Sequence, residues 1–266
     1  MPTTGDLARV ERLLNSDRVW TTYALADLQD DFAGACRWLT SADGTEEAVA
    51  LLYSGLEPPV LFAAGAPDAL ERALAGMALP PRVYLSVREE HLPVIEKLYD
   101  NSGDHRPMYR MILTDAARAV SRIELAPERL TASSIPHVET LLAWNGPFTP
   151  DAFAPYQVEQ GVFYGVWDNT GALVAVGGTH IVDWTRHVAA IGNMYTRPDR
   201  RGCGYATAIL AALVQTLRAR NVETIVLNVD QRNQGARHLY EEHGFVVYCP
   251  YVEGIAVTRG QHKISS

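Results

Sequence analysis

Residues 196–206 read Thr-Arg-Pro-Asp-Arg-Arg-Gly-Cys-Gly-Tyr-Ala, and this stretch decides how the chain around it is interpreted. A mostly apolar run typical of a strand leads into it at residues 189–196, and apolar residues recur at helical spacing over residues 206–217. Strand, basic glycine turn and helix predict an anion site, because the first amides of a helix lack partners and the helix dipole makes that end positive. Glycine lets the main chain approach a ligand closely, and Arg200 and Arg201 add charge that suits a pyrophosphate.

Two other glycine-rich loops must be distinguished from this one. A P-loop ends in Gly-Lys-Ser or Gly-Lys-Thr, whereas Gly204 is followed by Tyr205, so a P-loop is excluded. A dinucleotide fingerprint needs a third glycine or alanine where Thr207 stands, and an acidic residue at the end of the next strand. Glu223 precedes that strand instead of ending it, which disfavours a dinucleotide-binding fold.

A second motif lies one helix and one strand further along the chain. Residues 233–245 read Asn-Gln-Gly-Ala-Arg-His-Leu-Tyr-Glu-Glu-His-Gly-Phe. This segment resembles the Asn-x-x-Ala-x-x-Leu-Tyr-x-x-x-Gly-Phe segment of the GNAT acyltransferase superfamily, and residues 201–206 fit that superfamily's Arg/Gln-x-x-Gly-x-Gly/Ala signature. The resemblance covers residues 122–258. It implies an α/β GNAT-like acyl-CoA N-acyltransferase fold, with a mixed central sheet flanked by helices, and transfer of an acetyl group from acetyl-CoA to an amine by direct attack in a ternary complex.

The same resemblance implies roles for particular residues. Main-chain groups of Met194, Tyr195 and Thr196 would pair with the pantetheine arm of acetyl-CoA as an added strand does, and Asn233 would also reach that arm. Main-chain amides of the basic glycine turn would hold the pyrophosphate. The turn residues concerned are Arg201, Gly202, Cys203, Gly204, Tyr205 and Ala206. Tyr240 would be the general acid, because a phenol can protonate or stabilise the departing thiolate.

The general base is not evident from the sequence. Many GNAT enzymes have a glutamate on the strand before the turn, where residues 189–191 here are Ala-Ala-Ile. The amine could lose its proton through water, or to Asp230, His180 or Asp183, and these alternatives stay open. An acyl-cysteine mechanism at Cys203 is disfavoured, because that residue has no evident base partner.

Composition limits the partners. The net charge of -8 argues against a general nucleic-acid surface, and no apolar run reaches membrane-spanning length. Three scattered cysteines lack metal-ligand spacing and suit a reducing cytoplasm. We therefore expect a cytoplasmic protein with no metal, nucleic-acid or membrane partner, while a homodimer stays open. The acceptor, a small-molecule or peptide amine, would lie beside aromatic residues that could equally be core residues. These are Trp144, Phe148, Phe153 and Tyr156.

The chain also shows a weak internal repeat. Leu-Ser-Val at residues 85–87, followed by a helical pattern ending in Leu-Tyr at 98–99, parallels Leu-Asn-Val at 227–229 and Leu-Tyr at 239–240. In the first copy, residues 65–67 are Gly-Ala-Pro where the basic glycine turn should be, and a proline has no amide to offer. We therefore predict a tandem fold. Residues 1–118 would be a degenerate domain that binds no acyl donor and packs against a catalytic domain at residues 119–266.

Hydrophobic periodicity and turn residues predict the elements of both halves. In the first half we expect helices at residues 6–27, 67–77 and 92–99, and strands at 35–39, 48–52, 60–62, 83–87 and 109–113. In the second half, besides the elements at the two motifs, we expect helices at 133–144 and 150–160, strands at 122–125 and 224–229, a hairpin at 162–182 and two closing strands at 246–248 and 253–257.

Two other functions stay open. Without the glutamate, the protein could be a non-catalytic acyl-CoA-binding sensor, although Tyr240 argues against this, because a pure binder has no use for a leaving-group acid. The two-copy layout also resembles, in organisation alone, a tandem-domain acetyltransferase of the mycothiol-synthase type.

Overall fold

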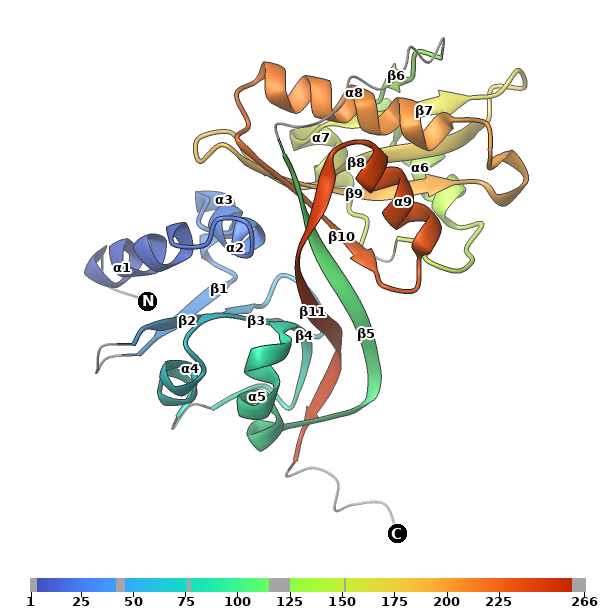
Figure 1. Ribbon diagram of the computed structural model, residues 1–266. Coiled ribbons are helices and arrows are strands. Elements are labelled where there is room, and N and C mark those ends of the chain that lie inside the picture. Colours follow the sequence, from blue (N-terminus) through green and yellow to red (C-terminus); the bar gives the residue numbers. More distant parts are fainter. Residues whose placement is uncertain (1–3, 42–45, 76–77, 115–124, 151, 260–266) are drawn as a thin grey trace. The chain divides into compact units, whose positions relative to one another are not determined.

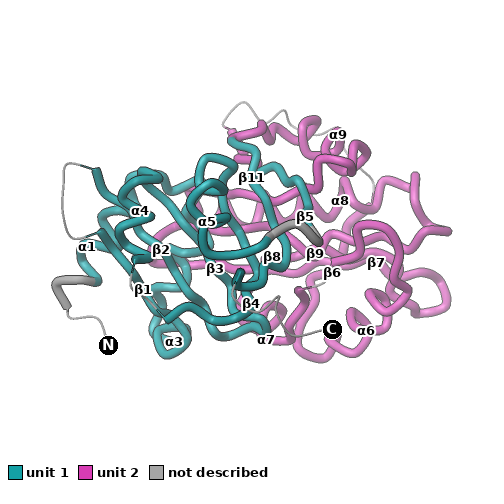
Figure 2. The backbone as a smooth tube through the Cα atoms, turned by 90° about the horizontal axis from the view of Figure 1, so that it is seen from below, with its two compact units in different colours: residues 1–110, 249–266 teal, residues 111–248 magenta. Residues whose placement is uncertain are grey.

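The computed structural model describes residues 4–41, 46–75, 78–114, 125–150 and 152–259, which fall into two compact units (Figures 1 and 2). The first unit comprises residues 1–110 and 249–266, and the second comprises residues 111–248. The expected domain boundary at residue 118 lies outside the described residues. The chain from residue 249 onward belongs by its contacts to the first unit, because the last strand pairs there with β4 (Arg82–Arg88) over residues 251–257.

The first unit is a sheet with helices packed against it. Its elements in chain order are α1 (Thr4–Asn15), α2 (Thr22–Ala26), α3 (Asp30–Ala33), β1 (Cys36–Thr40), β2 (Ala48–Tyr53), β3 (Val60–Gly65), α4 (Pro67–Leu74), β4, η1 (Glu89–His91), α5 (Leu92–Leu98) and β5 (Tyr99–Leu113). Strands β1, β2 and β3 are antiparallel neighbours, and β4 runs parallel to β3. Helix α4 starts with Pro67, whose missing amide costs nothing at the first helical position, and buries Leu70 and Leu74 in the core of the unit.

The second unit has a helix on one face of its sheet and two shorter helices on the other. Its elements are β6 (Glu128–Arg129), η2 (Ala132–Ser134), α6 (Ile135–Leu142), α7 (Pro155–Gln160), β7 (Phe163–Trp167), β8 (Leu173–Asp183), β9 (Val188–Thr196), η3 (Pro198–Arg200), α8 (Tyr205–Ala219), β10 (Thr224–Asp230), α9 (Gln234–Glu242) and β11 (Phe245–Thr258). Strands β6 to β9 are antiparallel neighbours, and β10 runs parallel to β9.

Two adjacent glycines of β8 identify the faces of this sheet, because successive strand residues point to opposite sides. A Cβ on Gly177 would touch Ile209 of α8, whereas a Cβ on Gly178 would touch Phe163. Phe163 packs in a core cluster with Val138 of α6 and Val158 of α7. Helix α8 therefore covers one face of the sheet, and α6 and α7 cover the other (Figure 1).

Both units repeat one order of elements. Three antiparallel strands are followed by a helix, a strand parallel to the third, a second helix and a long final strand (Figure 1). The final strand is β5 after α5 and β11 after α9, and β11 continues past residue 248 into the part of the chain that belongs to the first unit. Helix α4 thus corresponds to α8, and α5 to α9. The predicted α/β tandem fold with mixed sheet and flanking helices is confirmed.

Several predicted elements differ from the structure, among them the strand expected at residues 109–113, which begins at Tyr99. The helix expected at residues 6–27 is two helices, because the Asp17 carboxylate accepts from the amide of Trp20 in a turn between them. The helix expected from residue 150 begins at Pro155. The two closing strands are one strand, β11, because pairing with β4 from Tyr251 onward continues the strand past Pro250. Most of the strand expected at residues 122–125 lies outside the described residues.

Candidate functional site

The glycine turn of residues 201–204 leads directly into α8. Gly202 and Gly204 both have a φ of 77°, the left-handed region that only glycine enters at little cost. A Cβ built on either residue would meet no atom within 4 Å. Both glycines therefore border open space, which leaves room for a ligand against the main chain.

The amides of this turn are available to such a ligand. Gly204 is the N-cap of α8 and has no side chain to accept from the first turn of the helix. In the part of the chain that the structure describes, no main-chain carbonyl accepts from the amides of residues 202–207, and the first bond runs from the Ala208 amide to the Gly204 carbonyl at 3.0 Å. Unpartnered amides at the positive end of a 15-residue helix form an anion site.

The arginines of the turn are not equivalent. Arg200 lies 3.3 Å from the Asp168 carboxylate, whose pKa is held below its usual value by hydrogen bonds from Thr170. Arg201 donates from Nε to the Thr196 carbonyl at 3.2 Å and forms no ion pair among the described residues. The expectation that both arginines supply charge to an anion needs correction, because Asp168 neutralises Arg200 and leaves the charge of Arg201.

Strand β9 separates from β10 just before the turn. The two strands are paired only from Val188 to Ile191, and β10 then continues to Asp230 without pairing to β9. The residues after Ile191 stay paired with β8 on their other side, and Asn193 adopts a left-handed φ of 52° at the separation. Within the described residues, one edge of Met194, Tyr195 and Thr196 therefore pairs with no strand, as the addition of an extended ligand strand requires.

Tyr240 and Asn233 lie on the segment that follows β10. Tyr240, on α9, is 6% exposed and packs edge-on against Phe245, with ring centroids 6.1 Å apart. Burial raises the pKa of Tyr240 to about 12, so the phenol is protonated at neutral pH. Its hydroxyl forms no hydrogen bond with any described residue. Asn233 is the N-cap of α9, and its side-chain oxygen accepts from the Ala236 amide at 3.2 Å, which leaves its amide hydrogens as donors.

The three candidate bases differ in what already holds them. Asp183 accepts from the amides of Thr185 and Arg186, both at 2.9 Å, and shapes a turn. Asp230 forms a close ion pair with Arg232 at 2.6 Å. The ring of His180 lies over Gly192, where a Cβ would come within 2.5 Å of its Nε2. His180 thus lies against the residue after the last β9–β10 pair, and Asp230 ends the part of β10 that has left β9.

The four aromatic residues expected at an acceptor site divide into two kinds. Phe153 packs edge-on against Phe163 of the core, with centroids 6.1 Å apart, and Tyr156 is half-buried. Trp144 and Phe148 are exposed, and the guanidinium of Arg197 lies 5.1 Å from the Trp144 ring. The Tyr195 hydroxyl donates to the Asn145 carbonyl at 3.0 Å, which ties this loop to β9.

The sequence analysis missed Asn193 as a functional candidate. This residue is 2% exposed, and its amide donates to the side chain of Gln157 on α7 at 2.9 Å. The available signal was an asparagine inside an apolar strand, because asparagine tolerates the left-handed conformation of a bulge better than other residues with side chains do.

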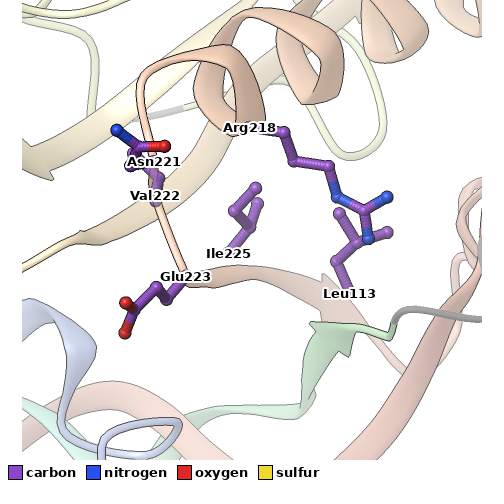
Figure 3. Close-up of a pocket in the computed structure, with 6 residues that line it drawn as sticks. All are labelled: Leu113, Arg218, Asn221, Val222, Glu223 and Ile225. Carbon is purple, nitrogen blue, oxygen red and sulfur yellow. The ribbon is translucent and has the colours of Figure 1, made fainter.

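A cavity of about 400 Å³ lies away from this site (Figure 3). Its lining comes from the end of α8 and the start of β10, whereas the candidate site is at the start of α8 and the far end of β10. The lining residues are Leu113, Arg218, Asn221, Val222, Glu223 and Ile225. Within the described ranges, no three side chains of His, Cys, Asp or Glu are grouped to hold a metal ion, and no helix is long and apolar enough to cross a membrane.

Comparison with known proteins places the glycine turn and the Tyr240 segment in one family match. Residues 132–245 match the family described as the acetyltransferase (GNAT) family. Over 57 residues the chain is 39% identical to the ribosomal protein bS18 alanine N-acetyltransferase of Haemophilus ducreyi. That stretch is 21% of this chain and 39% of that protein, so the chain spans about two fifths of this relative.

Two solved structures resemble nearly the whole chain. A Drosophila protein is 15% identical with a TM-score of 0.67, over 92% of this chain and 88% of its own. An acetyltransferase of the GNAT family from Colwellia psychrerythraea is 12% identical with a TM-score of 0.59, over 97% of each chain. At these identities the comparison shows the fold, and it does so across both units.

Proposed function

Residues 132–245 form a domain of the GNAT acetyltransferase family, and from this premise we propose that the protein is an acetyl-CoA-dependent N-acetyltransferase. The observation that carries the proposal is the glycine turn, whose amides donate to no carbonyl of the described residues at the start of α8. Acetyl-CoA offers that turn a pyrophosphate, which matches it in charge and in hydrogen-bond acceptors.

Donor binding uses two adjoining features of the second unit. The amides from Gly202 to Ala206 hold the pyrophosphate, and Arg201 adds the one turn guanidinium that no carboxylate neutralises in the described residues. The pantetheine arm lies along the free edge of residues 194–196, where β9 has left β10, and the amide of Asn233 approaches it from the start of α9. The thioester then reaches the end of the strand separation.

The reaction joins the amine nitrogen to the acetyl carbon and breaks the bond from that carbon to sulfur. The attacking amine loses one proton, to His180 or to water, and the coenzyme leaves as a thiolate that becomes a thiol. Because the thioester is already reactive, holding amine and carbonyl in contact supplies much of the acceleration.

The protonated Tyr240 phenol helps the thiolate leave. Burial raises the pKa of Tyr240 to about 12, so its hydroxyl keeps its proton at neutral pH. That hydroxyl donates a hydrogen bond to the developing sulfur charge or transfers its proton to the departing thiolate.

The acceptor is a primary or secondary amine of a small molecule or a peptide. Trp144 and Phe148 offer exposed aromatic surface near Arg197 for the body of such a substrate. A peptide amine is one specific candidate, because the matched Haemophilus protein is named for the alanine of a ribosomal protein.

Calorimetry with acetyl-CoA tests the donor site. We expect Gly204→Glu to abolish binding through steric block and like charge. Gly171→Glu is the matched control, because Gly171 has a φ of 79° and equally open space but precedes no helix. Wild-type affinity in Gly204→Glu would refute the pyrophosphate site.

One observation favours a second candidate, a non-catalytic acyl-CoA sensor. Residues 189–191 carry no carboxylate, and Asp183 and Asp230 are engaged by arginines. Thiol release from acetyl-CoA with a panel of amines, amino acids and short peptides separates the two functions. Turnover with any acceptor supports the enzyme, whereas tight donor binding without turnover across the panel supports the sensor.

A further inference from the structure

Asn193 presents a buried acceptor that has no donor. We infer that the side-chain oxygen of Asn193 accepts a hydrogen bond from the N–H of the acceptor amine and so positions that nitrogen for attack. The inference rests on the proposed function and names a substrate-contacting residue for it. Asn193 is 2% exposed, and its buried Oδ1 has no hydrogen-bond partner among the described residues.

The orientation of the Asn193 amide follows from its neighbours. The side-chain oxygen of Gln157 accepts from the main-chain amide of Ala154 at 3.1 Å, and the Gln157 nitrogen donates to the Ala152 carbonyl at 3.1 Å. A main-chain N–H can only donate, so the Gln157 atom that faces Asn193 is an oxygen. Asn193 must therefore present its nitrogen to Gln157, at 2.9 Å, and its own oxygen is the group left over.

The oxygen belongs to the residue at which the proposed donor site begins. Asn193 stands where β9 separates from β10, and its left-handed φ forms the bulge at that point. Gln157 belongs to α7, so the Asn193 amide is held on the face of the sheet that α6 and α7 cover (Figure 1). The pantetheine arm is proposed to use main-chain groups along the strand edge, which leaves this side-chain oxygen for the second substrate.

The chemistry of the oxygen limits the ligand. A buried amide oxygen accepts from N–H or O–H and offers no negative charge, so it favours a neutral primary or secondary amine over a tertiary amine. A neutral amine is also the form that attacks a thioester. The contact would place one N–H on Asn193 while the nitrogen lone pair faces the acetyl carbon.

The test compares steady-state kinetics with donor affinity. Asn193→Gly removes the oxygen and keeps the left-handed backbone without strain. Asn221→Gly is the matched control, because Asn221 has a φ of 60° and lies on an exposed turn after α8. We expect Asn193→Gly to raise the KM for the amine by tenfold or more, with the Kd for acetyl-CoA within threefold of wild type, and Asn221→Gly to change neither.

A second pair of variants tests the orientation without touching Asn193. Gln157→Glu keeps an oxygen for both Asn193 and Ala154, whereas Gln157→Met removes it. Only Gln157→Met should raise the KM for the amine. If Asn193→Gly does not fold, this pair of variants still tests whether the Asn193 oxygen contacts the amine. Unchanged amine KM in both Asn193→Gly and Gln157→Met overturns the inference, and so does a loss confined to acetyl-CoA affinity, which would assign the oxygen to the pantetheine arm. If wild-type protein binds no acetyl-CoA, the proposed function fails and this inference fails with it.

Discussion

The turn before α8 and the turn before α4 occupy the same place in the repeated fold. Among the described residues, only the turn before α8 leaves its main-chain amides without partners. Gly202 and Gly204 border open space, and the amides after them donate to no carbonyl in the residues described. Before α4, the Ala66 amide donates to the Glu47 carbonyl at 3.0 Å, and a Cβ on Gly65 would lie 2.3 Å from that oxygen. The first unit thus fills with its own main chain the place that the second leaves for an anion.

The strand separations differ in the same way. Strand β3 is paired with β4 only from Val60 to Phe62, much as β9 is paired with β10 only over its first residues. The indole N–H of Trp20 donates to the freed carbonyl of Ala63 at 2.8 Å, and its ring stacks on Phe62 with centroids 5.3 Å apart. Trp20 is fully buried, so the first unit closes its separation with a side chain. The fold alone therefore does not make a donor site.

The tyrosines at the ends of the corresponding helices complete the comparison: Tyr99 follows α5, and Tyr240 lies near the end of α9. Burial raises the pKa of both Tyr99 and Tyr240 to about 12. The Tyr99 hydroxyl donates to the Pro80 carbonyl at 2.9 Å, whereas the Tyr240 hydroxyl has no partner among the residues described. Tyr99 is committed to holding the first unit together, while Tyr240 keeps its donor for a ligand.

Replacing the turn before α8 with the sequence of the turn before α4 should have the largest effect on acetyl-CoA binding. Cys203→Gly, Gly204→Ala and Tyr205→Pro together reproduce the Gly-Ala-Pro of residues 65–67 at the start of α8. We expect the Kd for acetyl-CoA to rise at least about 100-fold. Tyr205→Pro removes one charge-assisted hydrogen bond, and Gly204→Ala disfavours the left-handed φ of 77° that orients the turn, together a loss of roughly 3 kcal/mol. The helix should persist, since proline suits the first helical position. Calorimetry measures the Kd for acetyl-CoA, and circular dichroism measures the helix content. Cys203→Gly alone, which keeps every amide, is the control, and wild-type affinity in the triple variant would contradict the comparison.

Removing each tyrosine hydroxyl should separate catalysis from stability. Tyr240→Phe is expected to lower turnover by about 10- to 1000-fold with little change in acetyl-CoA affinity, because the departing thiolate loses its hydrogen-bond donor while the donor-binding main chain is untouched. Tyr99→Phe should leave turnover unchanged and lower the free energy of unfolding by about 1–3 kcal/mol, because the Pro80 carbonyl loses its donor. Thiol-release kinetics and urea unfolding distinguish the two. Unchanged turnover in Tyr240→Phe would remove that residue from the mechanism.

Removing the Trp20 side chain tests whether this residue alone closes the separation between β3 and β4. Trp20→Ala should lower the free energy of unfolding by about 3–5 kcal/mol, the usual loss for a large buried side chain. Trp20→Phe isolates the hydrogen bond to Ala63 and should cost less. Acetyl-CoA should still bind with a stoichiometry of one per chain, because Ala66 remains bonded and Pro67 offers no amide. A second binding site in Trp20→Ala, seen by calorimetry, would show that the turn contributes nothing to the difference.

The sequence predicted the parts of this contrast that are local. The glycines of the α8 turn and the proline of the α4 turn are signals within a few residues. Gly244 after α9 is another such local signal, since a glycine that follows a helix commonly adopts the left-handed conformation, and its φ is 86°. The tandem fold follows from the order of strands and helices, and the hydrophobic periodicity of the sequence predicts that order.

The closure of the first unit could not be predicted, because it depends on contacts distant in sequence. The Trp20 indole donates to the Ala63 carbonyl, and the Ala66 amide donates to the Glu47 carbonyl. No sequence periodicity links these positions. In the second unit, Asp168 neutralises Arg200 across a hairpin, so two adjacent arginines that look alike in the sequence differ in the structure. The bulge at Asn193 arises where two strands part, and strand separation is a property of the sheet.

Alkaline pH should weaken the protein through its buried tyrosines, and this is the smallest effect expected. The pKa of Tyr240 is 10.0 unperturbed and about 12 when buried, so its contribution to stability is complete below pH 10 and is lost as the pH rises toward 12. The loss amounts to at most about 2.7 kcal/mol, and Tyr240→Phe should remove that part of the pH dependence. Urea unfolding at pH 9 and pH 11 measures it. Tyr99→Phe should flatten the curve in the same way, because burial acts alike on both rings while only one hydroxyl is bonded. Equal slopes in wild type and Tyr240→Phe would mean that the Tyr240 phenol reaches solvent freely, and that the protonated donor required for thiolate departure is not secured by burial.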